Sequence, residues 1–136
     1  MKKYVVYQNG SIAHITSTKK EAKEYIETAL RLAVRYLEDI KKKDFKIKHQ
    51  KVFRKWMVAH YDEHGKVVGY YGGHGIHIIS DKLVPMLYEK NDPWAWKYYD
   101  KADAKEDVKN LRKEVRGPVK LVKLPRKEWI EYEECK

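Results

Sequence analysis

Apolar and polar positions alternate with two different periods over the first forty residues. Residues 4–7 and 12–15 are strand-like runs on either side of Asn9-Gly10, a dipeptide typical of tight hairpin turns. Residues 18–21 read Thr-Lys-Lys-Glu, which matches a capping box at the start of a helix. A stripe of apolar residues at helical spacing follows, formed by Ala22, Tyr25, Ile26, Ala29, Leu30, Ala33, Leu37 and Ile40. The pattern predicts a β-hairpin followed by a long amphipathic helix.

The middle of the chain has the pattern of a second hairpin. Apolar residues over 52–61 and 67–71 flank a turn-forming segment at residues 62–65. The run Gly-Gly-His-Gly at 72–75 allows either a bulge or tight turn between strands, or a close approach of backbone amides to a phosphate. Prolines interrupt residues 80–95, where the apolar positions between 83 and 88 favour one turn of helix.

The last third repeats the opening order. Residues 96–99 predict a strand, and residues 103–106 match a second capping box. A second helical stripe ends at Gly117-Pro118, where glycine suits the end of a helix and proline stops it. Residues 119–124 then predict a closing strand.

These elements predict an α+β fold, with an antiparallel β-sheet and two amphipathic helices packed on it, built from hairpin-helix units. We expect a single α+β domain over residues 1–127 and an acidic C-terminal tail over residues 128–136.

Charge changes this picture, because it is both large and uneven. The 136 residues include 30 Lys and Arg against 20 Asp and Glu, a formal net charge of +10. Residues 41–55 hold eight basic residues and one acidic residue, and residues 101–127 hold ten basic and four acidic residues. Such blocks repel one another in the compact state, and a partner that carries phosphates would remove the repulsion. The alternative is a lysine-rich surface that serves only solubility.

Aromatic residues interleave with the first basic block and could stack on unpaired bases. The two blocks are therefore the predicted nucleic-acid-binding segments. The residues that we expect to bind are Lys41, Lys42, Lys43, Lys46, Lys48, Lys51, Arg54 and Lys55, followed by Arg112, Lys113 and Arg116.

Several protein classes are excluded by composition. The chain has a single cysteine, Cys135, so an internal disulfide and a Cys-based zinc finger are not possible, and a reducing compartment is expected. No apolar run approaches the ~20 residues that a membrane span requires. The N-terminus lacks the apolar segment of a signal peptide. We therefore expect a cytoplasmic protein that does not associate with a membrane.

The histidines suggest two further functions, metal binding and acid–base catalysis. His60, His64, His74 and His77 lie close in sequence and are candidate metal ligands, although their spacing matches no metal motif and we expect no metal. The candidates for a catalytic role are His14, His74 and His77. The tripeptide His14-Ile15-Thr16 resembles the His-x-Thr element of two-histidine phosphoesterases, which implies one histidine as acid and one as base. The second copy departs from that pattern, because in His77-Ile-Ile-Ser80 the hydroxyl is displaced by one residue.

A second resemblance concerns the segments Tyr-Val-Val-Tyr-Gln-Asn-Gly, Thr-x-x-Glu-Ala-x-x-Tyr-Ile and Gly-Lys-Val-Val-Gly-Tyr-Tyr-Gly-Gly. Together these segments look like small accessory proteins of bacteriophages and mobile elements. That resemblance implies an anti-defence role in a bacterial host cell, exerted by binding a defence protein, its guide RNA or a signalling nucleotide. It implies no functional residues.

Taken together, the sequence favours a small basic binding protein rather than an enzyme, with no cofactor. Its expected partner is anionic, either nucleic acid or a host nucleic-acid-binding protein in complex with nucleic acid, and its expected role is a phage-type inhibitor of a host defence system. Two alternatives stay open. One is an inhibitor that acts by direct protein–protein binding, and the other is a histidine-dependent phosphodiesterase or cyclic-nucleotide binder.

Overall fold

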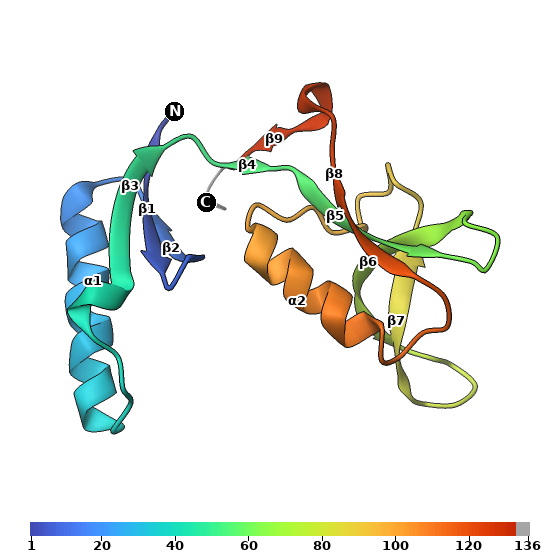
Figure 1. Ribbon diagram of the computed structural model, residues 1–136, viewed down its shortest axis with the longest axis horizontal. Helices are drawn as coiled ribbons and strands as arrows, with labels where there is room; N and C mark the ends of the chain where they lie inside the picture. Colours follow the sequence, from blue (N-terminus) through green and yellow to red (C-terminus); the bar gives the residue numbers. More distant parts are fainter. Residues whose placement is uncertain (133–136) are drawn as a thin grey trace. The chain divides into compact units, whose positions relative to one another are not determined.

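The computed structural model describes residues 1–132, which form two compact units (Figure 1). Unit 1 comprises Met1–Val52 with the described part of Glu131–Lys136, and unit 2 comprises Phe53–Ile130. Each unit has one α-helix and its own antiparallel sheet, so the α+β class is confirmed. The strands form separate sheets instead of the single sheet expected. The single domain over residues 1–127 stays a prediction.

Unit 1 is a three-stranded sheet with one helix. The hairpin of β1 (Lys3–Gln8) and β2 (Ser11–Thr16) is followed by α1 (Lys19–Arg35) and β3 (Phe45–Gln50), and the sheet order is β2-β1-β3. At the hairpin turn, Asn9 and Gly10 both adopt a positive φ, 52° and 87°. Two successive positive φ angles are what a tight hairpin turn with the right twist requires, so the predicted hairpin is confirmed.

Helix α1 begins at Thr18, the N-cap that the sequence predicted. The Thr18 hydroxyl oxygen accepts a hydrogen bond from the backbone N–H of Glu21 at 3.2 Å, and the hydroxyl donates to the Glu21 carboxylate at 2.9 Å. The apolar stripe packs on the sheet around Val6, Ala22 and Phe45. Leu37 was wrongly placed in that stripe. It follows the end of the helix with a φ of 58°, which turns its side chain 93% into solvent.

The lysine-rich segment before residue 51 contains a strand that was not predicted from the sequence. A short 3₁₀ turn, η1 (Lys42–Asp44), leads into β3, where Phe45 and Ile47 pack against α1. Because side chains alternate along a strand, the intervening Lys46 and Lys48 lie on the other face, where both are exposed.

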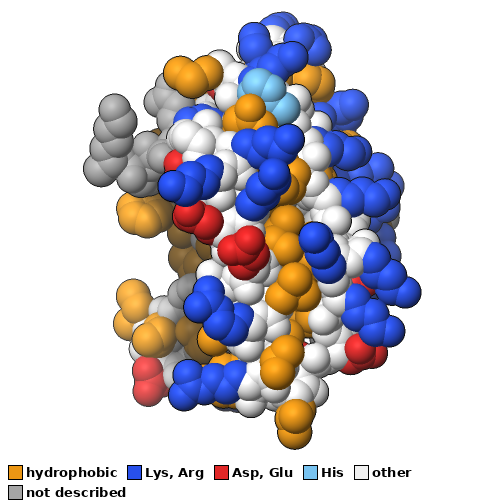
Figure 2. All heavy atoms as spheres, turned by 90° about the vertical axis from the view of Figure 1, so that its left-hand side faces the viewer, with side chains coloured by type: hydrophobic (Ala, Val, Ile, Leu, Met, Phe, Trp, Pro, Cys, Tyr) orange, Lys and Arg blue, Asp and Glu red, His pale blue; other side chains and the backbone are white. Residues whose placement is uncertain are grey.

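An apolar hollow of about 450 Å³ runs between α1 and β3. Figure 2 shows this side of the molecule, where an apolar stripe is flanked by Lys and Arg side chains. The hollow is lined by Lys23, Ile26, Glu27, Leu30, Lys42, Phe45 and Ile47.

Unit 2 is a four-stranded sheet with helix α2 packed on one face. The sheet order is β7-β6-β5-β8, and all pairs are antiparallel. The buried residues between helix and sheet include Val58, Ala104, Val108 and Leu111. The elements in chain order are β4 (Phe53–Arg54), β5 (Trp56–Tyr61), β6 (Val67–Ile76), β7 (Leu83–Tyr88), α2 (Lys101–Leu111), β8 (Val119–Lys123), the 3₁₀ turn η2 (Arg126–Glu128) and β9 (Ile130–Glu131), which pairs with β4.

The two units share one chain order. Each contains a hairpin, continues to a helix, and then adds a strand that pairs antiparallel with the first strand of that hairpin. In unit 1 the closing strand β3 pairs with β1, and in unit 2 the closing strand β8 pairs with β5. Strand β7, at the edge of the unit 2 sheet, has no counterpart in unit 1. The hairpin-helix pattern in the sequence therefore corresponds to a common topology.

Three local predictions in unit 2 are wrong. Residues 83–88 form the edge strand β7, where Pro85 is tolerated because only one side of the strand is paired. Residues 96–99 form a loop with a single bridge between Trp56 and Tyr98. Helix α2 is capped by Asp100, whose carboxylate accepts from the Ala102 N–H at 3.1 Å, so the segment that matched a capping box lies inside the first turns.

The predicted acidic tail begins within ordered structure. Glu128 ends η2, and Trp129 packs against the buried cluster of Met57, Ala95 and Leu124. Cys135 lies outside the described residues. Neither helix within residues 1–132 has the length and apolar character that would let it cross a membrane.

Replacing the helix cap of unit 1 tests the local account of α1. We expect Thr18→Ala to lower the free energy of unfolding by about 1 kcal/mol, because the Glu21 N–H loses its acceptor. Urea denaturation followed by circular dichroism measures the change. Ser17→Ala is the control, since Ser17 is exposed and caps no helix. Equal stability losses in the two variants would contradict the assignment of the cap.

Candidate nucleic-acid interface

One end of the unit 2 sheet gathers aromatic and basic side chains from distant parts of the chain. Strands β5 and β8 are antiparallel, so the start of β5 lies beside the end of β8, with Trp56 opposite Lys123. The chain then turns through η2 to Trp129. We call this the tryptophan surface, and it consists of Lys55, Trp56, Lys101, Lys123, Arg126 and Trp129.

Three cations surround the ring of Trp129. The distances to the ring centroid are 4.8 Å from Lys55 Nζ, 5.6 Å from Lys123 Nζ and 5.0 Å from Arg126 Cζ. The indole N–H donates to the Leu124 carbonyl at 2.8 Å, which fixes the orientation of the ring. Cations attracted to an aromatic face in this way are held at the surface without a carboxylate partner.

The ring of Trp56 holds the cations Lys101 and Lys123, whose Nζ atoms lie 5.1 Å and 5.6 Å from its centroid. Across residues 1–132, no carboxylate forms an ion pair with any of the four cations of the tryptophan surface. Positive charge is therefore concentrated here without local neutralisation, an arrangement that weakens the compact state and favours an anionic partner.

Trp96 forms an aromatic platform that borders this surface. Its ring is 47% exposed and meets the rings of Tyr71 and Tyr98 edge-on, with centroids at 5.2 Å and 6.2 Å. The ring packs closely against Gly73, where a Cβ atom would come within 2.7 Å of Trp96 Cζ2. Gly73 also has a φ of +92°, in the left-handed region that favours glycine.

The glycine run is thus explained as a bulge. The register of β6 against β7 shifts between Tyr71 and His74, and the space above the glycines is filled by the Trp94 carbonyl and the Trp96 ring. Of the two readings that the sequence left open, the bulge accounts for these contacts, because no room is left above Gly72 and Gly73 for a phosphate.

A hollow of about 240 Å³ opens over the Trp96 platform, and we call it the Trp96 hollow. Within it, Arg54 Nη1 donates to the Lys97 carbonyl at 3.0 Å, and the guanidinium lies 5.2 Å from the centroid of the Tyr99 ring. The hollow is lined by Arg54, Trp96, Lys97, Tyr98, Tyr99, Asp100 and Asp103.

Two groups of the hollow have perturbed acidity. Burial raises the pKa of the Asp103 carboxyl, and the nearby charges of Asp100, Asp107 and Glu106 raise it further. Burial is also the largest cause of a strongly raised pKa at Tyr98, whose hydroxyl donates to the Asp107 carboxylate at 2.5 Å. Tyr98 therefore remains a neutral donor, and Asp103 is a carboxylate in an unfavourable setting.

The first predicted basic block is divided between the two units. Lys43, Lys46 and Lys48 line a second hollow, of about 370 Å³, beside Tyr7 and the Asn9-Gly10 turn of unit 1. Lys48 Nζ lies 5.3 Å from the centroid of the Tyr7 ring. We call these three lysines with Tyr7 the β3 surface.

The other members of the first block are spread over both units. Lys41 precedes η1 and its backbone N–H donates to Asp44, Lys42 borders the apolar hollow of unit 1, and Lys51 is exposed after β3. Arg54 and Lys55 belong to unit 2, where they join the Trp96 hollow and the tryptophan surface. The basic block therefore contributes to separate surfaces of the two units.

The second predicted group has a structural component. The Arg112 guanidinium donates twice to the Val119 carbonyl, from Nε at 3.1 Å and from Nη2 at 3.0 Å, so it ties the end of α2 to β8. The Arg116 carbonyl lies 2.5 Å from His60 Nε2. Lys113 is exposed. From the same basic segment, the cations that reach the tryptophan surface are instead Lys101, Lys123 and Arg126, which sequence reasoning missed as site residues.

The candidate metal ligands have separate roles. His60 bonds to the Arg116 carbonyl, and His74 lies between the Tyr71 hydroxyl at 2.7 Å and the Glu114 carboxylate at 2.8 Å. His77 accepts from the Ser80 N–H at 3.2 Å within its loop. No group of three His, Cys, Asp or Glu side chains that could hold a metal ion occurs in residues 1–132.

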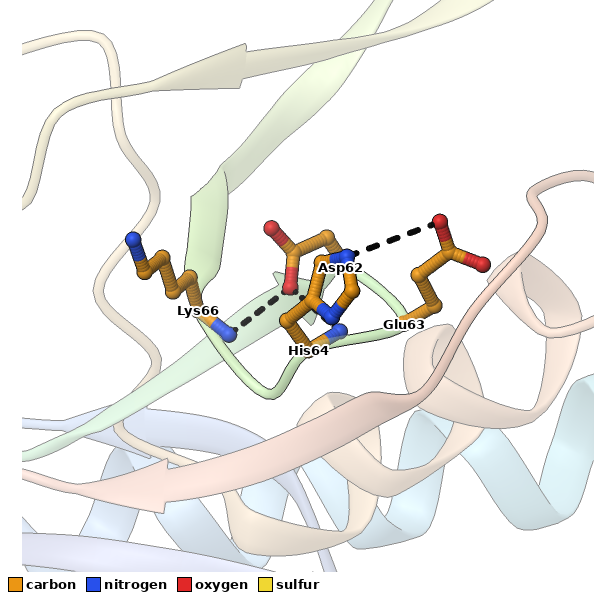
Figure 3. Close-up of polar contacts among 4 residues, drawn as sticks. All are labelled: Asp62, Glu63, His64 and Lys66. Carbon is orange, nitrogen blue, oxygen red and sulfur yellow. Dashed lines mark hydrogen bonds and ion pairs between the residues drawn. The ribbon is translucent and has the colours of Figure 1, made fainter.

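His64, the fourth candidate, lies on the β5–β6 turn (Figure 3). The Asp62 carboxylate accepts from the backbone N–H groups of His64 and Lys66, both at 2.9 Å, which closes the turn. The His64 ring points to the exposed Glu63 at 3.8 Å. The arrangement explains the turn and brings no further ligand to His64.

The His-x-Thr element of unit 1 is engaged in structure. His14 stacks on Tyr25 with ring centroids 4.5 Å apart, and the Thr16 hydroxyl donates to the Thr18 carbonyl at 2.8 Å. Thr16 is also only 2% exposed. His74 and His77 belong to unit 2. These contacts give the hydroxyl a role at the start of α1 and do not favour a phosphate-binding role.

Gly73→Ala tests the support of the Trp96 platform. A Cβ at this position would displace the Trp96 ring, so we expect altered near-ultraviolet circular dichroism and altered tryptophan fluorescence. Gly65→Ala is the matched control, since Gly65 also has a positive φ but its Cβ would meet nothing within 4 Å. Both variants should lose about 1–2 kcal/mol of stability from the left-handed backbone. Wild-type aromatic spectra in Gly73→Ala would refute the platform.

Tyr98→Phe tests the buried hydroxyl through pH. Because the Tyr98 pKa is raised in the folded state, the folded protein keeps a proton that the unfolded chain loses above about pH 10. Stability therefore falls as pH rises through that region, and the fall should be shallower in Tyr98→Phe. Urea denaturation from about pH 8 to about pH 11 measures this. Tyr36→Phe, at a ring that is 65% exposed, should keep the wild-type slope.

Comparison of the chain with protein-family models, with curated proteins and with solved structures finds no match. The resemblances to phage accessory proteins and to two-histidine phosphoesterases therefore stay predictions from the sequence. What the tryptophan surface and the Trp96 hollow can bind follows from their own chemistry.

Proposed function

We propose that the protein is a non-enzymatic binding module that binds single-stranded nucleic acid through the tryptophan surface of unit 2. The observation that carries this proposal is the set of three cations around Trp129, at 4.8–5.6 Å from its ring, none of which is paired with a carboxylate of residues 1–132. A phosphate backbone would supply the missing negative charge and release its own counterions.

Single strands fit the surface better than duplexes. Exposed aromatic rings bind unpaired bases by stacking, which a duplex does not offer. Trp94 and Trp96 of the same unit, at 71% and 47% exposure, supply such rings. Three of the four cations of the tryptophan surface are lysines, which contact phosphate as point charges and do not read base edges in a groove as arginine forks do.

The β3 surface of unit 1 repeats this chemistry on a smaller scale. Lys43, Lys46 and Lys48 border one hollow together with Tyr7, and none of the three forms an ion pair within the described chain. We assign it additional phosphate contacts. In the cell, such binding would serve the proposed inhibitor role, by occupying the nucleic acid of a host complex.

Direct protein binding is the second candidate function, and one observation favours it. The tip of the β6–β7 hairpin exposes Ile76, Ile78, Ile79 and Leu83, at 66%, 97%, 91% and 69%. Apolar side chains gathered at one exposed tip are typical of a protein contact site. An inhibitor that acts on a host protein would use this tip, and Ile78→Ser with Ile79→Ser would then abolish inhibition while leaving nucleic-acid binding intact.

The double variant Lys123→Gln with Arg126→Gln tests nucleic-acid binding. We expect weaker binding of a fluorescent single-stranded oligonucleotide, measured by anisotropy across a salt series. The slope of log affinity against log salt should fall by about 1.4, because each lost single-strand phosphate contact removes about 0.7.

The matched control is Lys105→Gln with Lys109→Gln, which removes the same charge from two exposed positions of α2 in the same unit. This control should bind with nearly wild-type affinity and slope. Equal losses in the two double variants would show that net charge, rather than the tryptophan surface, sets the affinity. Absence of binding by the wild-type protein at low salt would refute the proposed function.

A further inference from the structure

We propose that the Trp96 hollow is a nucleobase pocket that selects guanine, with the base stacked on Trp96 and its N1–H and N2 amino groups donating to the Asp103 carboxylate. This inference rests on the proposed function, because it assigns one base of the bound strand to a site that borders the tryptophan surface. It adds base selectivity to a surface whose cations would otherwise bind any sequence.

The floor of the pocket is rigid and partly open. The rings of Tyr71 and Tyr98 meet the Trp96 ring edge-on, Gly73 packs against it, and the Trp96 backbone N–H donates to the Tyr71 carbonyl at 3.0 Å. A preorganised ring loses little conformational freedom when a ligand stacks on it. The glycine bulge therefore has a role beyond strand geometry, since the absence of a side chain at Gly73 leaves room for this ring.

The size of the hollow suits a single base. Its volume of about 240 Å³ is below the roughly 300–1,000 Å³ of sites for drug-sized ligands. Arg54 and Lys97 lie on its wall and supply positive charge for the phosphate attached to the base. Both residues are close in sequence to members of the tryptophan surface. Arg54 directly precedes Lys55, and the loop that contains Trp96 and Lys97 leads to Lys101 at the start of α2.

Guanine is selected by the acceptors that the pocket offers. Asp100 uses a carboxylate oxygen to cap α2, and Asp107 accepts from Tyr98. Asp103 has no hydrogen-bond or ion-pair partner in residues 1–132, so both of its oxygens are available. Guanine is the base that places two donors, N1–H and the N2 amino group, side by side for one carboxylate.

The setting of Asp103 supports a ligand role. Burial and three neighbouring acids hold this carboxylate in an unfavourable field, as shown by its raised pKa. Carboxylates kept in such a setting beside a hollow are typical of binding and catalytic sites. Two donors of a base would offset the repulsion.

Inosine separates guanine recognition from general binding, because it lacks only the N2 amino group. The measurement is the anisotropy of labelled oligothymidylates that carry one central guanine, inosine, adenine or thymine. We expect guanine to bind about tenfold more tightly than inosine, since bidentate recognition discriminates by roughly five- to 150-fold. Asp103→Asn should remove this preference and keep the wild-type affinity for plain oligothymidylate.

Glu89→Gln is the control variant, because it removes a negative charge from an exposed position of the same unit that neither lines the hollow nor acts on the Asp103 carboxyl. It should keep the preference for guanine. Trp96→Leu should weaken binding of the guanine oligonucleotide more than binding of plain oligothymidylate. Equal affinity of the wild type for guanine and inosine, or an unchanged preference in Asp103→Asn, would overturn the pocket while leaving the proposed function standing.

If no oligonucleotide binds, the proposed function fails, and the pocket is then decided by mononucleotides alone. Guanosine monophosphate should quench the part of the tryptophan fluorescence that Trp96→Phe removes, and inosine monophosphate should do so about tenfold more weakly. Equal quenching by the two nucleotides, or none, would refute the inference.

Discussion

The antiparallel pairing of β5 with β8 is the constraint on which the candidate interface depends. It places Trp56 opposite Lys123, although the two residues are far apart in the sequence. The same pairing fixes where the chain leaves β8, and therefore where Arg126 and Trp129 lie. Helix α2 packs on this sheet and begins at Lys101, beside the ring of Trp56. The register between β5 and β8 thus brings four cations and two indole rings together on one surface.

The proposed base pocket depends on a second, local constraint. Gly73 has a positive φ and no side chain, and both properties are needed for the Trp96 ring to rest on the β6 backbone. Tyr98 fixes the opposite side, since its buried hydroxyl is committed to Asp107. The Trp96 ring thus packs against both Gly73 and Tyr98. A fixed ring can stack on one base while flexible lysine side chains contact the phosphates of a flexible single strand.

Local signals in the sequence predicted local structure well. The Asn9-Gly10 turn and the Thr18 N-cap each depend only on neighbouring residues, and both are confirmed. Strand β3 was missed because lysines at alternate positions masked Phe45 and Ile47, although their spacing of two was the available signal. The binding role of the two charge blocks stays a prediction, and sequence order alone did not show where their side chains gather. Lys48 and Lys55 belong to the same block in sequence but to different units. Lys55 and Lys123 are far apart in sequence, yet both lie over the ring of Trp129. Only the long-range pairing of strands decides this.

Binding of single-stranded nucleic acid at the end of the unit 2 sheet would change the surroundings of the tryptophan rings, which the indole N–H signals in a ¹⁵N–¹H spectrum report. The four tryptophans give four resolvable signals, assigned by single Trp→Phe variants. On titration with a single-stranded oligonucleotide, the account predicts shifts of the Trp56, Trp96 and Trp129 signals together with the backbone amides of residues 123–128. Shifts confined to the Ile78–Ile79 loop or to α1, with all four indole signals unmoved, would contradict it.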